Sequence, residues 1–391
     1  MNAQPSAKLI VLAAGGTGGH VFPAEALAQE LLAQGHRLAL VTDKRGAAYG
    51  GTLGEIDTYN ISAQGLTGRG IWGLIKGAFS LATGVWQARK LLEGLRPAAV
   101  VGFGGYASAP TVYAATQLGI PTVIHEQNAI LGRANRLLAG RVARVCTSID
   151  LAKPAAEGAR VVRTGMPVRS AVAEKRASPY TAPMGEQHFK LLVLGGSQGA
   201  KVFSDVIPEA MKLLPEALRK RMEIAQQCRP EELDRTLSAY HDAGVHVQLR
   251  VFFDNVPELL AGAHLLIARS GASTVAEACV VGRPSLLIPY PYAADNHQAF
   301  NADALAAAGG GWALRQNQFT PKALAELIAQ FAAAPAALSK AAGAASAFAV
   351  PDAASRLADV VTTLVRGPDT ARAPAKPAAP ISTHTMNRGI V

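Results

Sequence analysis

Short apolar runs alternate with amphipathic stretches along most of this chain. The segment 8–14 (KLIVLAA) is apolar at almost every position, and glycines lead from it into a helical pattern over 23–35 (PAEALAQELLAQG). Further apolar runs follow at 37–43 (RLALVTD), 98–105 (AAVVGFGG) and 121–127 (PTVIHEQ). Strands that alternate with helices predict βαβ units and a parallel sheet. Runs that are apolar throughout are typical of strands buried on both faces.

A second series of the same kind begins at residue 190. The segment 190–214 (KLLVLGGSQGAKVFSDVIPEAMKLL) repeats the order of 8–32 (KLIVLAAGGTGGHVFPAEALAQELL), with an apolar strand, a glycine turn that carries a hydroxyl, and an amphipathic helix. Further strands are predicted at VHVQLRVFF, LLIARSG and SLLIPYP. We therefore predict an α/β protein with two Rossmann-like domains that face each other across a cleft.

The limits of the two series predict the domain boundaries. We expect an N-terminal domain over 1–165 and a C-terminal domain over 166–350, with the join near RTGMPVRS. A Pro-Asp pair is the start signal of a last helix over 351–366, which can cross back to the N-terminal domain. The stretch 367–391 is rich in Pro, Ala and basic residues, a composition typical of a disordered tail.

Composition narrows the classes of function. The chain has 391 residues, 49% of them hydrophobic, and a formal net charge of +10, which favours anionic partners without choosing among them. Its three cysteines lie far apart, which predicts neither a disulfide framework nor a zinc site and fits a reducing cytoplasm. The sequence has no Walker A lysine motif, HExxH or aspartate-rich loop, and no nucleic-acid recognition motif, so neither a metal site nor nucleic-acid binding is expected.

The two glycine turns are the first candidates for chemistry. In 15–20 (GGTGGH) and 195–200 (GGSQGA), a strand leads through glycines into a helix whose first N–H groups can hold a phosphate. The spacing differs from the G-x-G-x-x-G dinucleotide motif, and a plain tight turn is the alternative for each. His20 lies in the first helical turn, where the helix dipole disfavours its charged form. It is therefore either a neutral general base or a histidine that caps the helix or supports other side chains.

Polar residues follow several other strands. Glu277, within 269–284 (RSGASTVAEACVVGRP), can accept hydrogen bonds from both ribose hydroxyls or merely complement the helix dipole. The segment 289–302 (PYPYAADNHQAFNA) suits sugar hydroxyls, although N-capping explains one or two of its polar residues. The segments 102–110 (GFGGYASAP) and 124–136 (IHEQNAILGRANR) also follow strands. Open α/β sheets bind ligands outside the carboxyl ends of their strands, so these segments predict one common site.

Together these segments resemble the MurG family of glycosyltransferases. The motifs GGTGGH, GFGGYASAP, HEQN, TGMPVR, GGSQGA, RSGASTVAE and HQAFNA occur in the family's order over residues 8–365. The resemblance implies the GT-B fold and an inverting transfer of N-acetylglucosamine (GlcNAc) from UDP-GlcNAc, without a metal or another cofactor. The implied acceptor is the C4 hydroxyl of N-acetylmuramic acid (MurNAc) in lipid I, which is undecaprenyl-pyrophosphoryl-MurNAc-pentapeptide. The implied product is lipid II, a precursor of peptidoglycan.

The resemblance also implies a place in the cell and a division of labour. A member of this family would be a peripheral protein at the cytoplasmic face of the bacterial inner membrane. The donor would bind mainly to the C-terminal domain and the acceptor to the N-terminal domain.

Roles of single residues are carried over position by position. Residues that match donor-binding or reaction-centre positions are Thr17, Gly18, Gly19, Asn128, Arg169, Ser197, Phe253, Ala272, Ser273, Thr274, Val275, Ala276, Glu277, His297 and Gln298. His20 is the expected base that deprotonates the acceptor, and Glu126 is the alternative. The family usually has TGNPVR where this chain has TGMPVR, so Met166 puts any role of that asparagine in doubt, whereas Arg169 matches.

The segment 70–90 (GIWGLIKGAFSLATGVWQARK) combines large apolar residues with cations. Polar residues interrupt it, so it is not expected to span a membrane. An apolar patch rimmed by cations instead suits the surface of an anionic bilayer, and a buried helix is the alternative. The predicted membrane contacts are Ile71, Trp72, Ile75, Lys76 and Phe79.

Two other classes of function stay open at this point. Another GT-B enzyme that uses a UDP-sugar, such as a glycolipid synthase or a UDP-GlcNAc epimerase, would carry similar turns. A non-catalytic protein that binds nucleotide sugars would need no base. The residues predict neither the oligomeric state nor the peptide variant of the acceptor.

Overall fold

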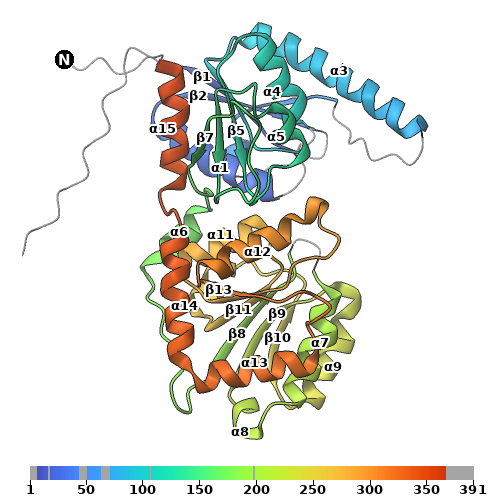
Figure 1. Ribbon diagram of the computed structural model, residues 1–391, viewed down its shortest axis with the longest axis vertical. Coiled ribbons are helices and arrows are strands. Elements are labelled where there is room, and N and C mark those ends of the chain that lie inside the picture. Colours follow the sequence, from blue (N-terminus) through green and yellow to red (C-terminus); the bar gives the residue numbers. More distant parts are fainter. Residues whose placement is uncertain are drawn as a thin grey trace, which may run out of the picture.

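The computed structural model describes residues 7–15, 18–43, 51–62, 71–105, 107–196 and 199–366, with the backbone alone described over 71–78. Two domains, each built on one parallel β-sheet, lie one above the other along the long axis of the molecule (Figure 1). The predicted α/β fold with two Rossmann-like domains is confirmed.

The N-terminal domain has a seven-stranded sheet in the order β3-β2-β1-β4-β5-β6-β7, and all its pairings are parallel. Its strands are β1 (Leu9–Ala13), β2 (Arg37–Thr42), β3 (Asp57–Asn60), β4 (Ala99–Gly102), β5 (Thr122–Glu126), β6 (Arg144–Thr147) and β7 (Val161–Arg163). Its helices are α1 (Gly18–Ala33), α2 (Gly51–Gly54), α3 (Ile71–Leu95), α4 (Ser108–Gln117) and α5 (Arg133–Leu138).

The C-terminal domain repeats this strand order in a six-stranded parallel sheet, β10-β9-β8-β11-β12-β13. Its strands are β8 (Phe189–Leu194), β9 (Met222–Gln227), β10 (His246–Arg250), β11 (Leu265–Ala268), β12 (Ser285–Leu287) and β13 (Gly311–Ala313). The helices that follow β7 are α6 (Ser170–Glu174), α7 (Lys201–Lys212), α8 (Glu216–Arg219), α9 (Leu233–Asp242), α10 (Val256–Gly262), α11 (Ala272–Val281), α12 (His297–Ala307), α13 (Pro321–Ala333), α14 (Pro335–Phe348) and α15 (Ala353–Arg366). Short 3-10 turns are η2 (Lys175–Ala177), η3 (Pro230–Glu232) and η4 (Ala294–Asn296).

Helices cover both faces of the first sheet, which explains why its strands are apolar throughout. In β1, Ile10 and Leu12 pack into a core with α1 and α15, whereas Val11 and Ala13 pack into a second core with α3 and α4. Successive residues of a strand point to opposite faces, so a strand between two cores needs an apolar residue at every position.

Two crossings of the chain join the domains. One passes Gly165, and the other passes Val350 between α14 and α15 (Figure 1). Gly165 has φ +85°, and a Cβ at this position would collide with Val350, so glycine is required where the crossings touch. Beyond this point, α15 packs on α1 and buries Leu357 and Val361 in the core of the N-terminal domain.

Helix α3 extends beyond the edge of the N-terminal sheet (Figure 1). Phe79 and Trp86 in this helix are 74% and 63% exposed. The side chains of the other predicted membrane contacts, Ile71, Trp72, Ile75 and Lys76, lie outside the described residues, as does the tail over 367–391. Within the described ranges, no helix has both the length and the apolar character needed to cross a bilayer.

Candidate active site between the domains

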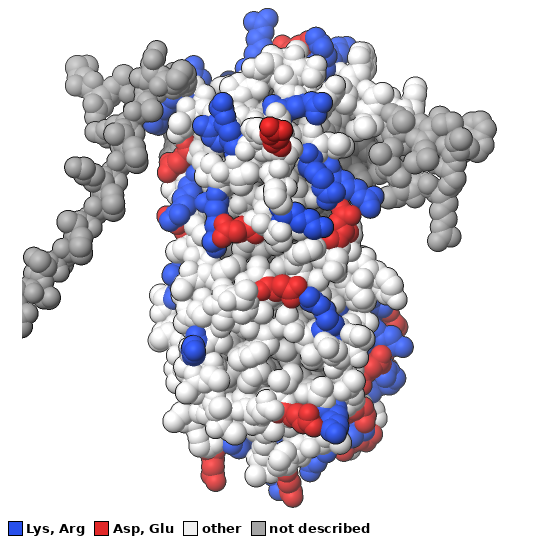
Figure 2. Space-filling view, in the orientation of Figure 1, with Lys and Arg blue, Asp and Glu red and all other residues white. Residues whose placement is uncertain are grey.

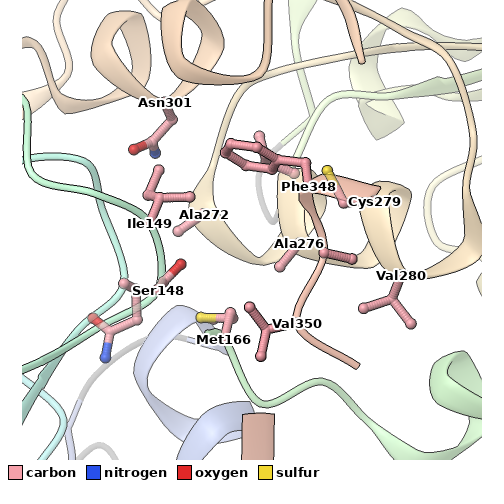
Figure 3. Close-up of a pocket in the computed structure, with 13 residues that line it drawn as sticks. Ser148, Ile149, Met166, Ala272, Ala276, Cys279, Val280, Asn301, Phe348 and Val350 are labelled. Atoms are coloured by element: carbon pink, nitrogen blue, oxygen red, sulfur yellow. The ribbon is translucent and has the colours of Figure 1, made fainter. Parts of the chain in front are cut away.

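A pocket lies between the two domains and takes its walls from both. Ser148 and Ile149 line it from the N-terminal side, Met166 lines it from the crossing between the domains, and Ala276 of α11 and Asn301 of α12 line it from the C-terminal side (Figure 3). The pocket therefore lies where the carboxyl ends of β5 and β6 meet the first turns of α11 and α12. The motifs HEQN, TGMPVR, RSGASTVAE and HQAFNA each contribute lining residues, whereas no described residue of the two glycine turns lines the pocket.

His20 stands on the N-terminal side of the cleft, in the first turn of α1. Gly104 makes room for its ring, because a Cβ at Gly104 would lie 2.9 Å from Cε1 of His20. His20 Nδ1 lies 3.2 Å from Oε1 of Gln127, and the backbone of Phe103 also interacts with the ring. Burial lowers the pKa of His20, and the negative charge of Glu126 opposes this shift only in part. A pKa below 6.5 favours the neutral imidazole at pH 7.

Gln127 connects His20 to the interior of the N-terminal domain. Its Nε2 donates to the carbonyl oxygen of Phe103 at 2.8 Å and to that of His125 at 3.1 Å. Gln127 is 3% exposed, so its amide is held by neighbours rather than by water. The sequence analysis quoted this glutamine within HEQN but assigned no role to it.

Glu126, the alternative base, is fixed inside its own loop. Its Oε1 accepts hydrogen bonds from the backbone and the side-chain N–H groups of Asn128, both at 3.1 Å. Its Oε2 accepts from the backbone of Gly132 and the side chain of Asn135, both at 2.8 Å. Because both carboxylate oxygens already bind donors of the same loop, the geometry favours His20 as the group that is free to accept a proton.

On the C-terminal side, two residues assigned to the donor site contact each other. Arg169 donates from Nε to Oε1 of Glu277 and from Nη2 to Oε2, both at 3.1 Å. The Arg169 guanidinium also lies 5.0 Å above the ring of Phe22 in α1. Burial raises the pKa of Glu277, and Arg169 opposes that rise. This bidentate pair joins the residue that precedes α6 to α11 and fixes the orientation of the Glu277 carboxylate.

Helix α11 begins at the pocket with unused polar groups. Gly271 at its N-cap provides no capping side chain, so the first N–H groups of the helix are available to an anion. Ser273 Oγ is buried and has no partner among the described residues. The other predicted members of this turn are Ala272, Thr274, Val275 and Ala276, of which Ala272, Val275 and Ala276 line the pocket.

The start of α12 carries the predicted sugar contacts. Gln298 Oε1 accepts from the backbone N–H of Tyr290 at 2.9 Å, and His297 Nδ1 donates to the carbonyl of Ala294 at 2.8 Å. Asp295 and Asn296 precede them with φ values of +50° and +57°. Non-glycine residues rarely adopt this left-handed conformation, and such strained turns cluster at functional sites.

Asn301 joins the two walls directly. Its Oδ1 accepts from the backbone N–H of Ala129 at 2.8 Å, and its Nδ2 donates to Oδ1 of Asn128 at 3.0 Å and to the carbonyl of Ser270 at 3.0 Å. Asn301 is fully buried. It lay within the polar cluster of the sequence analysis, but no role was assigned to it.

The other predicted residues are placed as follows. Gly18 and Gly19 begin α1, and Phe253 is buried just beyond β10. Thr17 and Ser197 lie outside the described residues. No cluster of three or more His, Cys, Asp or Glu side chains that could hold a metal ion occurs in the described part of the chain.

Family models match both domains. A model described as the glycosyltransferase family 28 N-terminal domain matches residues 10–147, and one described as the glycosyltransferase family 28 C-terminal domain matches residues 190–357.

Curated relatives share about half of the sequence. A protein of Paramagnetospirillum magneticum is 54% identical over 360 residues, which cover 91% of this chain and 97% of the relative. Its name is UDP-N-acetylglucosamine–N-acetylmuramyl-(pentapeptide) pyrophosphoryl-undecaprenol N-acetylglucosamine transferase. A protein of the same name from Rhodospirillum rubrum is 53% identical and covers 90% of this chain and 91% of its own length.

Solved structures show the same fold. The crystal structure of Acinetobacter baumannii MurG matches with a TM-score of 0.74 at 29% identity, and the match covers 91% of this chain and 99% of that one. A UDP-GlcNAc 2-epimerase from Neisseria meningitidis matches with a TM-score of 0.65 at 15% identity, covering 92% and 100%, and shares the fold alone. The chain is thus a glycosyltransferase of family 28 and belongs, within it, to the MurG family of N-acetylglucosamine transferases.

Proposed function

We propose that this enzyme transfers GlcNAc from UDP-GlcNAc to the C4 hydroxyl of MurNAc in lipid I and so produces lipid II. The observation that carries the proposal is the 54% identity, over 91% of the chain, to a transferase named for this donor and this acceptor. The interdomain pocket supports it, because both substrates must meet at such a place. Asn301 lines this pocket, His20 contacts its lining residue Gln127, and Glu277 lies in α11, which forms part of its wall.

In the proposed reaction, His20 acts as the general base. Its free Nε2 takes the proton of the acceptor C4 hydroxyl while the hydroxyl oxygen attacks the anomeric carbon of GlcNAc. The bond between that carbon and the diphosphate breaks, and UDP leaves on the opposite face. The anomeric centre is therefore inverted, and a β-1,4 linkage forms.

The leaving diphosphate needs stabilisation of its growing negative charge. The first N–H groups of α11 and of α1 supply partial positive charge at two helix N-termini. These groups are fixed before the reaction and so need no reorganisation. Arg169 orients the Glu277 carboxylate, which we assign to the ribose hydroxyls of the donor.

We assign α3 to the surface of the inner membrane, at its cytoplasmic face. Phe79 and Trp86 are largely exposed, and Lys90 Nζ lies 5.7 Å from the ring of Trp86. Lys and Arg side chains are spread over the N-terminal domain on the face shown in Figure 2, whereas much of the C-terminal domain is uncharged there. Exposed aromatic groups next to cations suit anionic headgroups.

Vesicle sedimentation tests this assignment. The double variant Phe79→Ser/Trp86→Ser should lose most binding to anionic vesicles and keep its thermal unfolding temperature, since both side chains are exposed. Leu237→Ser, at an exposed apolar position of α9 in the other domain, is the control. Equal binding by the double variant and the wild type would contradict the membrane assignment.

A turnover assay with UDP-GlcNAc labelled in the sugar and a soluble lipid I analogue tests the proposed reaction. We expect the label to move to the lipid analogue at the rate at which UDP is released. An epimerase would convert the UDP-sugar without labelling the lipid, and a binding protein would do neither. Either of these results would refute the proposal.

A further inference from the structure

The orientation of the Gln127 amide can be read from its surroundings. Its Nε2 faces the carbonyl oxygens of Phe103 and His125, which can only accept hydrogen bonds. The reverse orientation would place an amide oxygen against two carbonyl oxygens. Nε2 therefore occupies this position, and Oε1 faces His20.

This orientation decides which nitrogen of His20 carries the proton. Oε1 of Gln127 can only accept, so His20 Nδ1 must donate to it across 3.2 Å. A neutral imidazole has one N–H group, and Nε2 is then left as a lone pair. The hydrogen bonds of the described residues include none to Nε2, although the backbone of Phe103 also interacts with the ring.

A second histidine extends the network to the crossing between the domains. His125 is fully buried, and its Nε2 donates to the carbonyl oxygen of Gly165 at 2.9 Å. Its Nδ1 is then an acceptor and lies 3.3 Å from Nε2 of Gln127. The two N–H groups of Gln127 thus face three acceptors, namely the carbonyls of Phe103 and His125 and Nδ1 of His125, and His125 in turn donates to Gly165.

We infer that Gln127 is a positioning residue that fixes the proton of His20 on Nδ1 and keeps Nε2 free to accept the proton of the sugar hydroxyl. The catalytic part of this inference rests on the proposed function, whereas the position of the proton does not. With the proton on Nε2, His20 would donate to the acceptor hydroxyl and could not deprotonate it. The network also ties the orientation of the base to Gly165, where the chain passes between the domains.

The position of the proton is measured by ¹⁵N NMR on full-length protein labelled at its histidines. Long-range proton–nitrogen correlations separate the two neutral tautomers, and the variant His20→Gln assigns the signal. We expect the Nδ1–H form for His20 in the wild type and its loss in Gln127→Met, which keeps the length of the side chain but has no acceptor. An Nε2–H form in the wild type would overturn the inference, and so would an unchanged signal in Gln127→Met.

The same variants separate positioning from folding by their kinetics. In Gln127→Met, kcat should fall by roughly 10- to 100-fold, because a general base contributes about 10²–10⁴-fold and the wrong tautomer forfeits part of it. KM for UDP-GlcNAc should stay within about twofold, since the donor wall is untouched. Gln226→Met is the matched control, because Gln226 is equally buried but lies in the C-terminal sheet.

Gln127→Glu is the rescue variant. A carboxylate still accepts from His20 Nδ1, so the Nδ1–H form should persist and kcat should exceed that of Gln127→Met. Its second oxygen faces the carbonyl oxygens of Phe103 and His125 in place of the amide N–H groups, so the melting temperature should fall. The added charge should shift the acidic limb of the pH–rate profile to higher pH, because it favours the imidazolium form. The other titratable groups that face His20, namely His125, Glu126 and His297, are the same in both proteins. If Glu and Met variants are equally impaired and the limb does not move, Gln127 does not position the base.

Failure of this inference is distinguishable from failure of the proposed function. A wild type that transfers GlcNAc while His20 carries its proton on Nε2 would refute the positioning role alone. A wild type with the Nδ1–H form that does not transfer GlcNAc would refute the proposed function alone.

Discussion

The two walls of the cleft have the same strand order but different chemistry. On the N-terminal wall, His20, Gln127 and His125 bond to one another and to backbone carbonyls, and the network is neutral. On the C-terminal wall, Arg169 and Glu277 form a charged bidentate pair beside the start of α11. The two domains thus repeat one fold, and the residues that follow the strands decide the chemistry of each wall. We assign the neutral wall to proton transfer and the charged wall to holding the donor.

The largest expected effect comes from removal of the base. His20→Ala should lower kcat by about 10²–10⁴-fold, the usual contribution of general base catalysis, while the affinity for UDP-GlcNAc stays unchanged. Steady-state kinetics and calorimetric titration measure the two quantities. His241→Ala, at an exposed histidine of α9, is the control. A kcat for His20→Ala within a few-fold of the wild-type value would contradict the assignment of proton transfer to the N-terminal wall.

A change on the charged wall should act on binding instead. Glu277→Gln removes the charge that Arg169 balances and weakens the proposed ribose contact, and hydrogen bonds to charged groups contribute about 1.5–3 kcal/mol. We expect the Kd for UDP to rise roughly 10- to 100-fold, measured by calorimetry. Asp303→Asn, which breaks an exposed ion pair with Arg315, should leave Kd unchanged. A lower kcat at an unchanged Kd for UDP would contradict the assignment of Glu277 to donor binding.

Asn301 connects the walls, so its loss should affect both quantities to a smaller extent. Asn301→Ala leaves the buried N–H of Ala129 without a partner, at a cost of about 1–3 kcal/mol. We expect the melting temperature to fall by several degrees and kcat/KM to fall by roughly tenfold. Asn317→Ala, at an exposed position, is the control. An effect on kcat alone, or on the Kd for UDP alone, would show that Asn301 acts on only one wall.

Local sequence patterns predicted the sheets well but the site contacts only in part. Each strand is signalled by its own apolar run, and the start of the next helix by the glycine turn that follows within a few residues. Because these signals are local, the fold of both domains could be predicted. The bonds of Asn301 to Ala129 and of Arg169 to Glu277 join residues from distant segments, and no local pattern signals them. Gln127 stood within a recognised motif, but its role depends on the carbonyl of Phe103 in another loop. The sequence likewise did not signal that Glu126, the alternative base, accepts hydrogen bonds from Gly132 and Asn135 of its own loop.

The pH dependence of kcat/KM tests the central claim most directly. Because burial lowers the pKa of His20 from its usual value of 6.5, the imidazole stays neutral to a lower pH than a free histidine. Activity of the wild type should therefore be constant around pH 7 and should fall as the pH drops through a value below 6.5. The residual activity of His20→Ala should lack this acidic limb. The same limb in His20→Ala would show that another group is the base and would contradict the account.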